Sequence, residues 1–149
     1  MAIKNRSAKN KGYRFQRDIR DLLLEKFTNL LPEEIVSAPS SINGEDLILS
    51  DKARTVLGNV NFEAKRHEKI NVWSSLEQAE LESKKRNTNP ILIFRRNRSN
   101  TYATIQLEFL LQLLYNNMLY QELITHQNID MSKLKEIFND KFLDELFKK

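Results

Sequence analysis

The sequence predicts an α/β fold, in which a central mixed β-sheet is flanked by helices and extra helices follow at the carboxyl end. Residues 13–30 place apolar side chains three and four positions apart, as an amphipathic helix does. Short apolar runs at 45–49, 56–65 and 91–96 have the length and composition of β-strands. A helical segment at 74–86 separates the second run from the third, and such a crossover favours a parallel pair of strands.

The first half of the chain reads as one helix followed by three strands. The helix at 13–30 ends before Pro32, because proline cannot continue a helix. Residues 34–38 form a short strand candidate. The runs 45–49 and 56–65 read as the two arms of an antiparallel hairpin.

The second half adds a helix, two strands and a further helix. Ser74 or Ser75 is the expected amino-terminal cap of the helix at 74–86, because serine side chains accept hydrogen bonds from free backbone N–H groups. Residues 101–107 alternate like a strand that follows the buried one. The helix at 107–119 is strongly apolar, so something must cover it.

One domain is expected, because 149 residues are enough for one hydrophobic core but not comfortably for two. We divide it into a basic arm at 1–10, a core at 11–107 and a helical part at 108–149. Residues 129–149 carry apolar side chains at helical spacing and suggest one or two short amphipathic helices. The apolar residues of this carboxyl-terminal part are most simply core, and a dimer surface is the alternative.

The composition excludes several classes of protein. With 40% hydrophobic and 30% charged residues, the chain resembles globular proteins rather than disordered ones. No run is long and apolar enough to cross a bilayer, and no secretory signal pattern is present. Without cysteine there are no disulfides or cysteine-based zinc sites, and two histidines are too few for a typical zinc site. We therefore expect a cytoplasmic protein without membrane association.

Positive charge is concentrated at the amino terminus. The chain has a net charge of +4, yet residues 1–17 contain six basic residues and no acid, so the rest is slightly acidic. The six are Lys4, Arg6, Lys9, Lys11, Arg14 and Arg17. Such an arm is the footprint of a nucleic-acid binder, and a solvated, disordered tail is the alternative. Gly12, Tyr13 and Phe15 favour binding, because they tie the arm to an ordered helix.

Two acids and a lysine stand on strand-like runs, where solvated charges are unusual. Asp46 lies near the start of one run, whereas Glu63 and Lys65 lie at the end of the next and share a face, since side chains alternate along a strand. Paired arms would bring Asp46 close to Glu63. Neighbouring carboxylates repel each other unless a cation lies between them, and Mg²⁺ or Mn²⁺ prefers such oxygen ligands. The ammonium of Lys65 could then offset charge developing on a phosphate.

A second copy of the Glu-x-Lys pattern, Glu82-Ser83-Lys84, serves as an internal control. It lies in the middle of a predicted helix and no strand acid precedes it, so we interpret it as a solvated helix face. For the copy at Glu63, the alternative to a metal site is a surface ion pair, which contributes little to stability.

Taken together, "GED" at 44–46, the apolar strand and "EAK" at 63–65 resemble the PD-(D/E)xK nuclease superfamily, and within it the archaeal and phage-type Holliday junction resolvases. The resemblance covers about residues 11–107, including "KGYRFQRDIRDLL" before the site and "SAPSS" where those enzymes carry a serine-containing loop. It implies a restriction-endonuclease-like core and a phosphodiester-hydrolysing DNA endonuclease. It further implies Mg²⁺ or Mn²⁺ as cofactor, four-way or other branched DNA as substrate, and a homodimer.

The resemblance also implies roles for individual residues. Asp46 and Glu63 would be metal ligands, the Ala64 carbonyl a further ligand, and Lys65 the catalytic lysine. The family often has a glutamate on the first helix that assists the metal site, and here Gln16 occupies that position. Glutamine can hold a metal-bound water through its carbonyl group, but it brings no charge.

Two other acids bear on how the sequence departs from the family pattern. Asp18 is the nearest substitute for the missing acid, although it lies about 200° around the helix from Gln16. Glu45 stands where the pattern has the proline of "PD".

Contacts with DNA are expected from basic and serine side chains around the site. The candidates are Lys9, Lys11, Arg14, Arg17, Ser37, Ser40, Ser41 and Arg66. His67 and Lys69 could extend a phosphate track, and a solvated strand end is the alternative. Gln78 lies on the crossover helix, where such nucleases sometimes place a polar residue near the lysine. For Trp73 a core or helix-entry anchor is favoured over a base-stacking wedge.

The expected function is therefore that of a Holliday junction resolvase in a prokaryotic cell or a virus-infected host. One alternative is another PD-(D/E)xK endonuclease or nickase. The other, which Gln16 keeps open, is a non-catalytic DNA-binding module with the same fold.

Overall fold

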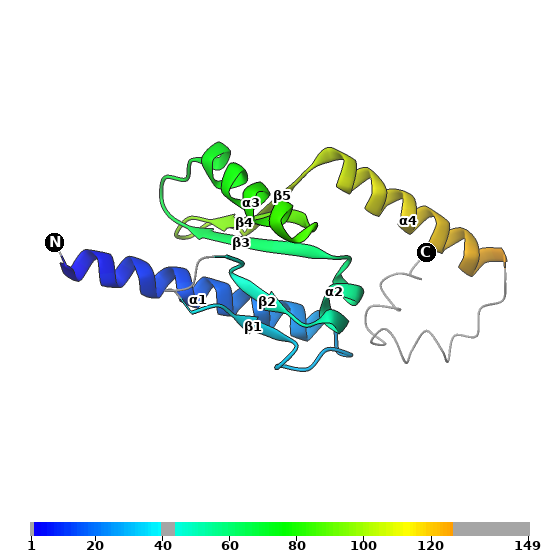
Figure 1. Cartoon of the computed structure of the whole chain (residues 1–149), viewed down its shortest axis with the longest axis horizontal. Helices are drawn as coiled ribbons and strands as arrows, with labels where there is room; N and C mark the ends of the chain where they lie inside the picture. Colours follow the sequence, from blue (N-terminus) through cyan, green and yellow to red (C-terminus); the bar gives the residue numbers. More distant parts are fainter. Residues whose placement is uncertain (1, 40–43, 127–149) are drawn as a thin grey trace.

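The computed structural model describes residues 2–39 and 44–126, and in them the chain alternates helices and strands (Figure 1). The elements are α1 (Ala2–Lys26), β1 (Ile35–Ser37), β2 (Leu47–Leu49), α2 (Asp51–Leu57), β3 (Val60–Arg66), α3 (Val72–Arg86), β4 (Asn89–Arg95), β5 (Tyr102–Ile105) and α4 (Leu107–His126). The predicted α/β class is confirmed. The short helices expected within 129–149 lie outside the described residues.

A three-stranded mixed sheet forms the centre of the fold, in the order β3-β4-β5. Strand β3 is parallel to β4, as predicted for two strands joined by the crossover helix α3, and β5 is antiparallel to β4. Helices α1 and α3 lie on opposite sides of β3 (Figure 1). The residues at the end of β3 therefore lie between two helices.

The hairpin predicted between 45–49 and 56–65 is wrong. Strand β2 pairs antiparallel with β1, and helix α2 takes up the predicted connection and the first two residues of the second predicted arm. The rest of that arm is strand β3, which belongs to the other sheet. The Ser50 side chain accepts a hydrogen bond from the Ala53 backbone N–H at 3.1 Å and so caps this helix. Gly58, at φ 85°, ends it in the left-handed conformation that glycine adopts without strain.

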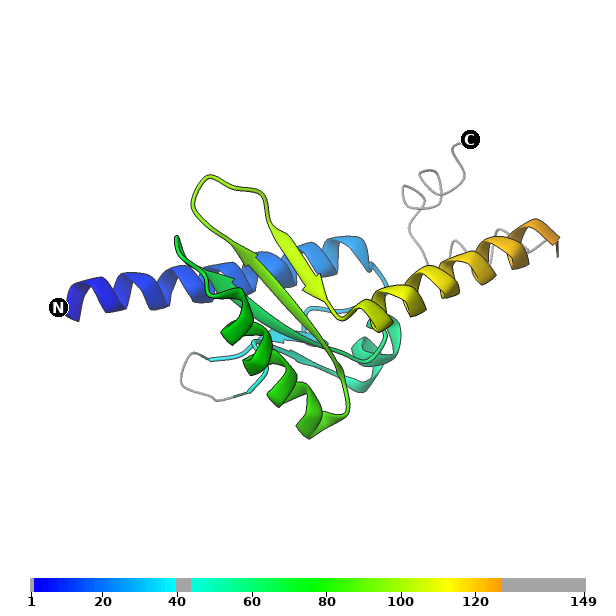
Figure 2. The ribbon, with the colours of Figure 1, turned by 90° about the horizontal axis from the view of Figure 1, so that it is seen from above.

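Two helices begin before their predicted starts. Helix α1 begins at Ala2 instead of residue 13, so the basic arm has a helical backbone, and its first turns project beyond the sheet (Figure 2). Its early residues have no apolar stripe, which is why periodicity did not reveal them. Helix α3 is capped by Asn71 rather than Ser74 or Ser75, and the Asn71 side chain accepts a hydrogen bond from the Ser74 N–H at 3.2 Å.

The hydrophobic core lies between α1 and the strands. It is built from Phe15 and Ile19 of α1, from the apolar side chains of β1 and β2, and from Val60, Phe62 and Ala64 of β3. Helix α3 covers the other face of β3 through small side chains that are buried, namely Ser75, Ala79 and Ser83. Small residues let this helix approach closely, so Asn61 and Glu63, which face it from β3, are buried, whereas Lys65 at the end of the strand is partly exposed.

The expectation that the apolar helix near the carboxyl end is core is wrong for the described part of α4. Figure 2 shows α4 leading away from the sheet. Seven of its large apolar side chains besides Leu107 are between 37% and 56% exposed: Leu110, Leu111, Leu113, Leu114, Tyr115, Met118 and Leu119. Despite its apolar character, neither α4 nor another helix of the described residues is long and apolar enough to span a membrane.

Trp73 is also misplaced by the sequence prediction. It lies in the first turn of α3 with 78% of its surface exposed, so it is neither core nor an anchor at the helix entry. Val72, which precedes it, takes the half-buried position instead.

Candidate active site

Strand β3 presents Glu63 and Lys65 on the face that α3 covers. Val60, Phe62 and Ala64 alternate with them and point into the core against α1. Glu63 is only 3% exposed, whereas Lys65 at the end of the strand is partly open to solvent. A buried carboxylate and a reachable amine thus lie next to each other.

Asp46 reaches the same place from the other sheet, immediately before β2. Its Oδ2 accepts a hydrogen bond from the Ala64 backbone N–H at 2.6 Å. Its own backbone N–H donates to the Phe62 carbonyl at 3.2 Å. These two bonds, rather than a hairpin register, bring Asp46 to the edge of β3 beside Glu63.

Gln16 of α1 contacts Asp46 directly. Its Nε2 donates a hydrogen bond to Asp46 Oδ1. Its other amide atom, Oε1, is buried and has no hydrogen-bond partner within the described part of the chain. The first helix therefore brings a carbonyl oxygen with a free lone pair to the site, at the position where the family pattern has a glutamate.

Lys65 is held by two partners. Its Nζ lies 2.5 Å from Glu63 Oε1 and donates a second hydrogen bond to Gln78 Oε1 at 3.0 Å. Gln78 comes from α3, so the crossover helix does place a polar residue beside the lysine. The ammonium group is fixed between β3 and α3 with one donor position left over.

The electrostatics of the site disfavour two bare carboxylates. Burial raises the pKa of Asp46, and hydrogen bonds from Ala64 and Gln16 together with the charge of Lys65 only partly oppose this. Burial also raises the pKa of Glu63, and repulsion from Asp46 raises it further, against the opposing effect of Lys65. The pKa of Glu63 is thus raised by the charge of Asp46, and a cation bound beside the two carboxylates would relieve this repulsion.

The residues present fit a hard divalent cation. The described residues contain no cluster of three or more His, Cys, Asp or Glu side chains that could hold a metal. Mg²⁺, however, is commonly bound by one or two carboxylates and completes its shell with water and substrate oxygens. Asp46 and Glu63 supply the carboxylates, and the buried Gln16 Oε1 is an oxygen that still needs a positively polarised partner.

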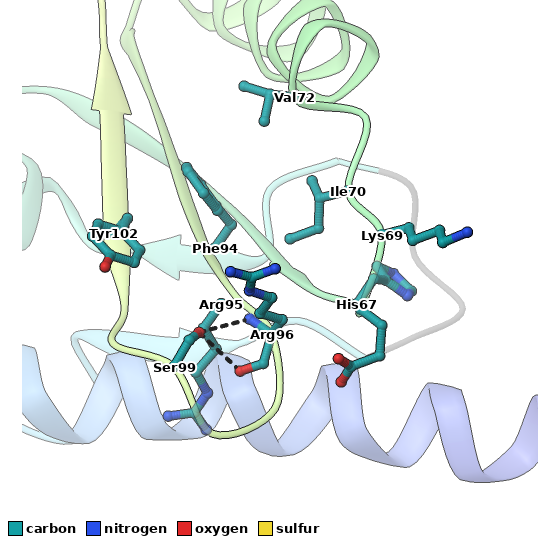
Figure 3. Close-up of a pocket in the computed structure, with 10 residues that line it drawn as sticks. His67, Lys69, Ile70, Val72, Phe94, Arg95, Arg96, Ser99 and Tyr102 are labelled. Atoms are coloured by element: carbon teal, nitrogen blue, oxygen red, sulfur yellow. Dashed lines mark hydrogen bonds between the residues drawn. The ribbon is translucent and has the colours of Figure 1, made fainter.

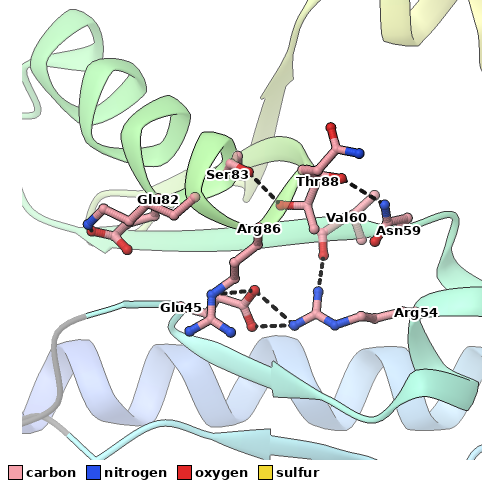
Figure 4. A network of polar contacts seen from close by, with 10 residues as sticks. Glu45, Arg54, Asn59, Val60, Glu82, Ser83, Arg86 and Thr88 are labelled. Atoms are coloured by element: carbon pink, nitrogen blue, oxygen red, sulfur yellow. Dashed lines mark hydrogen bonds and ion pairs between the residues drawn. The ribbon is translucent and has the colours of Figure 1, made fainter.

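Glu45, which replaces the proline of the family pattern, has a structural role (Figure 4). Its buried carboxylate oxygens accept hydrogen bonds from Arg54 Nη2 at 2.9 and 2.7 Å, and Arg86 Nε lies 3.4 Å from one of them. Arg54 Nη1 also donates to the Val60 carbonyl at 3.3 Å. This network ties α2 and α3 to the segment that carries Asp46. Sequence reasoning missed Arg54 and Arg86, and the signal available was an acid inside an apolar run that requires a cation.

The second copy of the Glu-x-Lys pattern, at Glu82 and Lys84, was expected to be a solvated helix face, and the structure agrees for only one of the two residues. Lys84 is exposed, as expected for a solvated helix face. Glu82 is not, because its side chain is 17% exposed and pairs with Lys85 at 2.7 Å. Its charge also contributes to the raised pKa of Glu63, so this acid of α3 faces the site.

Asp18 does not replace the missing acid of the first helix. Its carboxylate pairs with Arg95 of β4, whose guanidinium lies 4.5 Å from the centre of the Phe15 ring. This pair links α1 to the sheet. The charge of Asp18 is therefore neutralised away from Asp46 and Glu63.

The candidate DNA contacts fall into three groups. Lys11, Arg14 and Arg17 are exposed along α1, and Arg66 is half-buried at the end of β3. Ser37 is buried within β1, so the prediction that its hydroxyl contacts DNA does not fit the structure. Ser40, Ser41 and the side chain of Lys9 lie outside the described residues.

Comparison with known proteins gives one match. The family model of the phage putative PDDEXK endonuclease matches residues 7–148. No curated protein and no solved structure matches the chain. The match spans nearly the whole sequence and includes the segments that carry Asp46, Glu63 and Lys65. The chain therefore belongs to the phage PDDEXK endonuclease family, within the PD-(D/E)xK nuclease superfamily.

Proposed function

We propose that this protein is a metal-dependent DNA endonuclease, and most specifically a Holliday junction resolvase that cuts branched DNA in the cytoplasm of a prokaryotic or virus-infected cell. The observation that carries the proposal is the convergence of the half-buried carboxylate of Asp46 and the buried carboxylate of Glu63 beside the amine of Lys65. Membership of a PDDEXK endonuclease family supports the reaction class.

In this proposal Asp46, Glu63 and the Ala64 carbonyl hold Mg²⁺ or Mn²⁺, and Gln16 assists through its free carbonyl oxygen. When bound, the cation supplies Lewis-acid chemistry at a phosphate oxygen. Gln16 also orients Asp46 by donating to its Oδ1, while the Ala64 N–H fixes Oδ2. Both carboxylate oxygens of Asp46 are thus aligned before substrate arrives.

Lys65 acts on the phosphate. Its ammonium offsets the negative charge that develops in the transition state of phosphodiester hydrolysis. The pairing with Glu63 keeps the amine at the site, and Gln78 holds it from the opposite side through a neutral hydrogen bond. Because Gln78 is neutral, it holds the amine without cancelling any of its positive charge.

DNA is bound along α1 in this proposal. Lys11, Arg14 and Arg17 recur every third residue and are exposed, so they form a short row of positive charge leading to Gln16. Lys9, Ser40, Ser41 and Arg66 would add further contacts with the sugar-phosphate backbone. Binding through phosphates is strong but sequence-independent, as a nuclease that recognises DNA shape requires.

We further propose that the protein is a homodimer formed through α4. A resolvase must cut two strands symmetrically, and a two-fold dimer supplies two active sites. Leu107, Leu111, Leu114 and Met118 recur at spacings of four, three and four and are all exposed in the described structure. This pattern is the seam of a helix pair, and a second copy of α4 would cover it.

The decisive experiment incubates the purified full-length protein with a four-way junction, a linear duplex and a single strand, with and without Mg²⁺ or Mn²⁺. Paired symmetric nicks confined to the junction would support a resolvase. Cuts in duplex or single strands would instead indicate another DNA endonuclease. Binding without cleavage in either metal would indicate a non-catalytic DNA-binding module, which the uncharged Gln16 makes the second candidate.

A further inference from the structure

A pocket opens where β3 and β4 end, next to the candidate active site (Figure 3). It has a volume of about 590 Å³, within the range of small-molecule pockets. Its walls come from the loop between β3 and α3 and the first residue of α3, and from the end of β4, the β4–β5 connection and the first residue of β5. None of its residues takes part in the metal site proposed above.

The strand register connects this pocket to the catalytic lysine. Lys65 of β3 pairs with Phe94 of β4, and Phe94 pairs with Tyr102 of β5. Residues paired across neighbouring strands share a face, and the strands lie about 4.8 Å apart. The row Lys65, Phe94, Tyr102 therefore runs from the site of cutting into the pocket over roughly two strand spacings.

One part of the pocket suits a flat, apolar group. The rings of Phe94 and Tyr102 have their centres 6.1 Å apart at an angle of 31°. Tyr102 is 55% exposed, so much of its ring is accessible. Ile70 of the opposite loop and Val72 at the start of α3 are half-buried, and Figure 3 shows Phe94 between Tyr102 and Ile70. A nucleobase has the shape and stacking chemistry for this surface.

Another part of the pocket suits a phosphate. Lys69 and Arg96 are exposed, and within the described residues neither forms an ion pair with a carboxylate. The acid in the lining, Glu68, accepts a hydrogen bond from the Asn97 N–H at 3.0 Å. Arg95 is already paired with Asp18. Two uncommitted cations thus line the same pocket as an aromatic surface, the combination found where proteins bind single-stranded nucleic acid.

We propose that this pocket binds an unpaired nucleotide of the DNA substrate next to the bond that is cut. The base stacks on Tyr102 and Phe94, and its phosphate contacts Lys69 and Arg96. This inference rests on the proposed function, because it takes DNA as the substrate. It assigns the enzyme a preference for DNA in which a base beside the cut is unpaired, as at a branch point or a flap.

The test measures binding by fluorescence anisotropy of labelled DNA in EDTA, so that cutting does not contribute. Three probes are compared: a short duplex ending in unpaired thymidines, the same duplex with abasic residues in their place, and a blunt duplex. The abasic probe keeps the phosphates and loses only the bases. We expect the thymidine probe to bind about tenfold more tightly than the abasic one, from base stacking on the aromatic surface.

Variants then locate the effect. Tyr102→Ala should abolish the difference between thymidine and abasic probes, whereas Tyr102→Phe, which keeps the ring, should retain it. Lys69→Ala and Arg96→Ala should weaken both unpaired probes, with Lys84→Ala on α3 as an unaffected control. Equal affinity for the thymidine and abasic probes, or a preference that survives Tyr102→Ala, would overturn the proposal. Because Tyr102 is exposed, thermal unfolding is expected to show that its variants fold.

A free nucleotide is the other possible source of the same chemistry. Trp73 follows the pocket residue Val72 and is the only tryptophan of the chain, so its fluorescence reports on occupancy. If dTMP bound as tightly as the thymidine probe, the pocket would serve a free nucleotide and the assignment to DNA would be wrong. Failure of the proposed nuclease function is distinguishable, because it would appear as absent cleavage in Mg²⁺ and Mn²⁺ whatever the binding preference.

Discussion

Gln16 is the residue that sets this site apart from the family pattern. It orients Asp46 with its amide N–H and leaves its buried Oε1 without a partner in the described structure. A glutamate there would place a third carboxylate beside two whose pKa values are already raised. Glutamine supplies an oxygen ligand without that added repulsion.

Gln16→Glu should therefore raise the affinity for a divalent cation and lower the stability of the metal-free protein. A third negative charge attracts a divalent cation more strongly, and it destabilises the protein when no cation balances it. We expect tighter Mg²⁺ binding by calorimetry and a lower melting temperature in EDTA. Gln16→Ala is the matched control, and equal melting temperatures of wild type and Gln16→Glu in EDTA would contradict this account.

Lys65→Ala and Asp46→Asn should abolish cutting and leave DNA binding nearly intact. The first removes the charge that stabilises the transition state, and the second removes a metal ligand. Each is expected to lower the cleavage rate by at least about a hundredfold. Lys84→Ala, in the second Glu-x-Lys copy, is the control and should cut normally. Wild-type rates in either site variant would exclude the proposed roles.

The buried acids should make the protein less stable as pH rises. Burial raises the pKa of Asp46 and of Glu63, so the folded protein holds these protons more tightly than the unfolded chain. This contribution to stability is complete below the unfolded pKa values and is lost as pH rises through the raised folded values. At neutral pH, Asp46→Asn should therefore raise the free energy of unfolding, by about 0.5–2 kcal/mol.

Urea unfolding at neutral and acidic pH checks this sign. In acid Asp46 is itself neutral, so the gain from asparagine should disappear. A wild-type protein that is more stable than Asp46→Asn at neutral pH would show that the carboxylate is stabilised, not strained, by its surroundings.

At the scale of elements, α2 is a short helix that the sequence analysis did not predict. Ser50 and Gly58, which begin and end this seven-residue helix, are visible in the sequence as a possible cap and turn. Val56 and Leu57 are apolar and lie just before the apolar run of β3. The sequence prediction therefore joined the end of this helix and strand β3 into one strand. Short helices held by tertiary contacts have too few residues to establish a period.

Other elements, and the placement of Glu63 beside Lys65, were predictable because their signals are local. The parallel pair of β3 and β4 follows from an intervening helix, and alternation along β3 places Glu63 and Lys65 together. The position of Asp46 was predicted for the wrong reason, since it depends on long-range hydrogen bonds to β3 and not on a hairpin. Arg54 and Arg86 were missed because no local sequence pattern indicates which residues come into contact only in the folded chain.

Arg54→Ala should show how much the network around Glu45 contributes. The side chain of Glu45 is 2% exposed, so removing its main partner leaves a buried charge poorly compensated. The loss is expected to be about 3–5 kcal/mol, moderated by Arg86. Lys52→Ala on the same helix is the control, because its pair with Glu34 is exposed on the lysine side and is expected to contribute little to stability. Equal losses in a denaturant titration would contradict a special role for the buried pair.

At the scale of the whole molecule, α4 leads away from the sheet and leaves an apolar stripe uncovered by the described residues. We expect the protein to sediment as a dimer, and Leu111→Glu to shift it to a monomer by placing a charge in the seam. Leu81→Glu, at a comparably exposed leucine of α3, should leave the dimer intact. A wild-type protein that sediments as a monomer at every concentration would exclude dimerisation through α4.

The bonds that fasten Asp46 to β3 also bear on how the protein is synthesised. Asp46 is aligned by the Ala64 N–H and the Phe62 carbonyl, which are translated after it. A nascent chain that has left the ribosome only as far as β2 therefore contains Asp46 but lacks the β3 backbone that orients it. It also lacks the second carboxylate, Glu63, and the lysine, Lys65. Under the proposed function, we therefore expect translation products that stop before β3 to be unable to cut DNA.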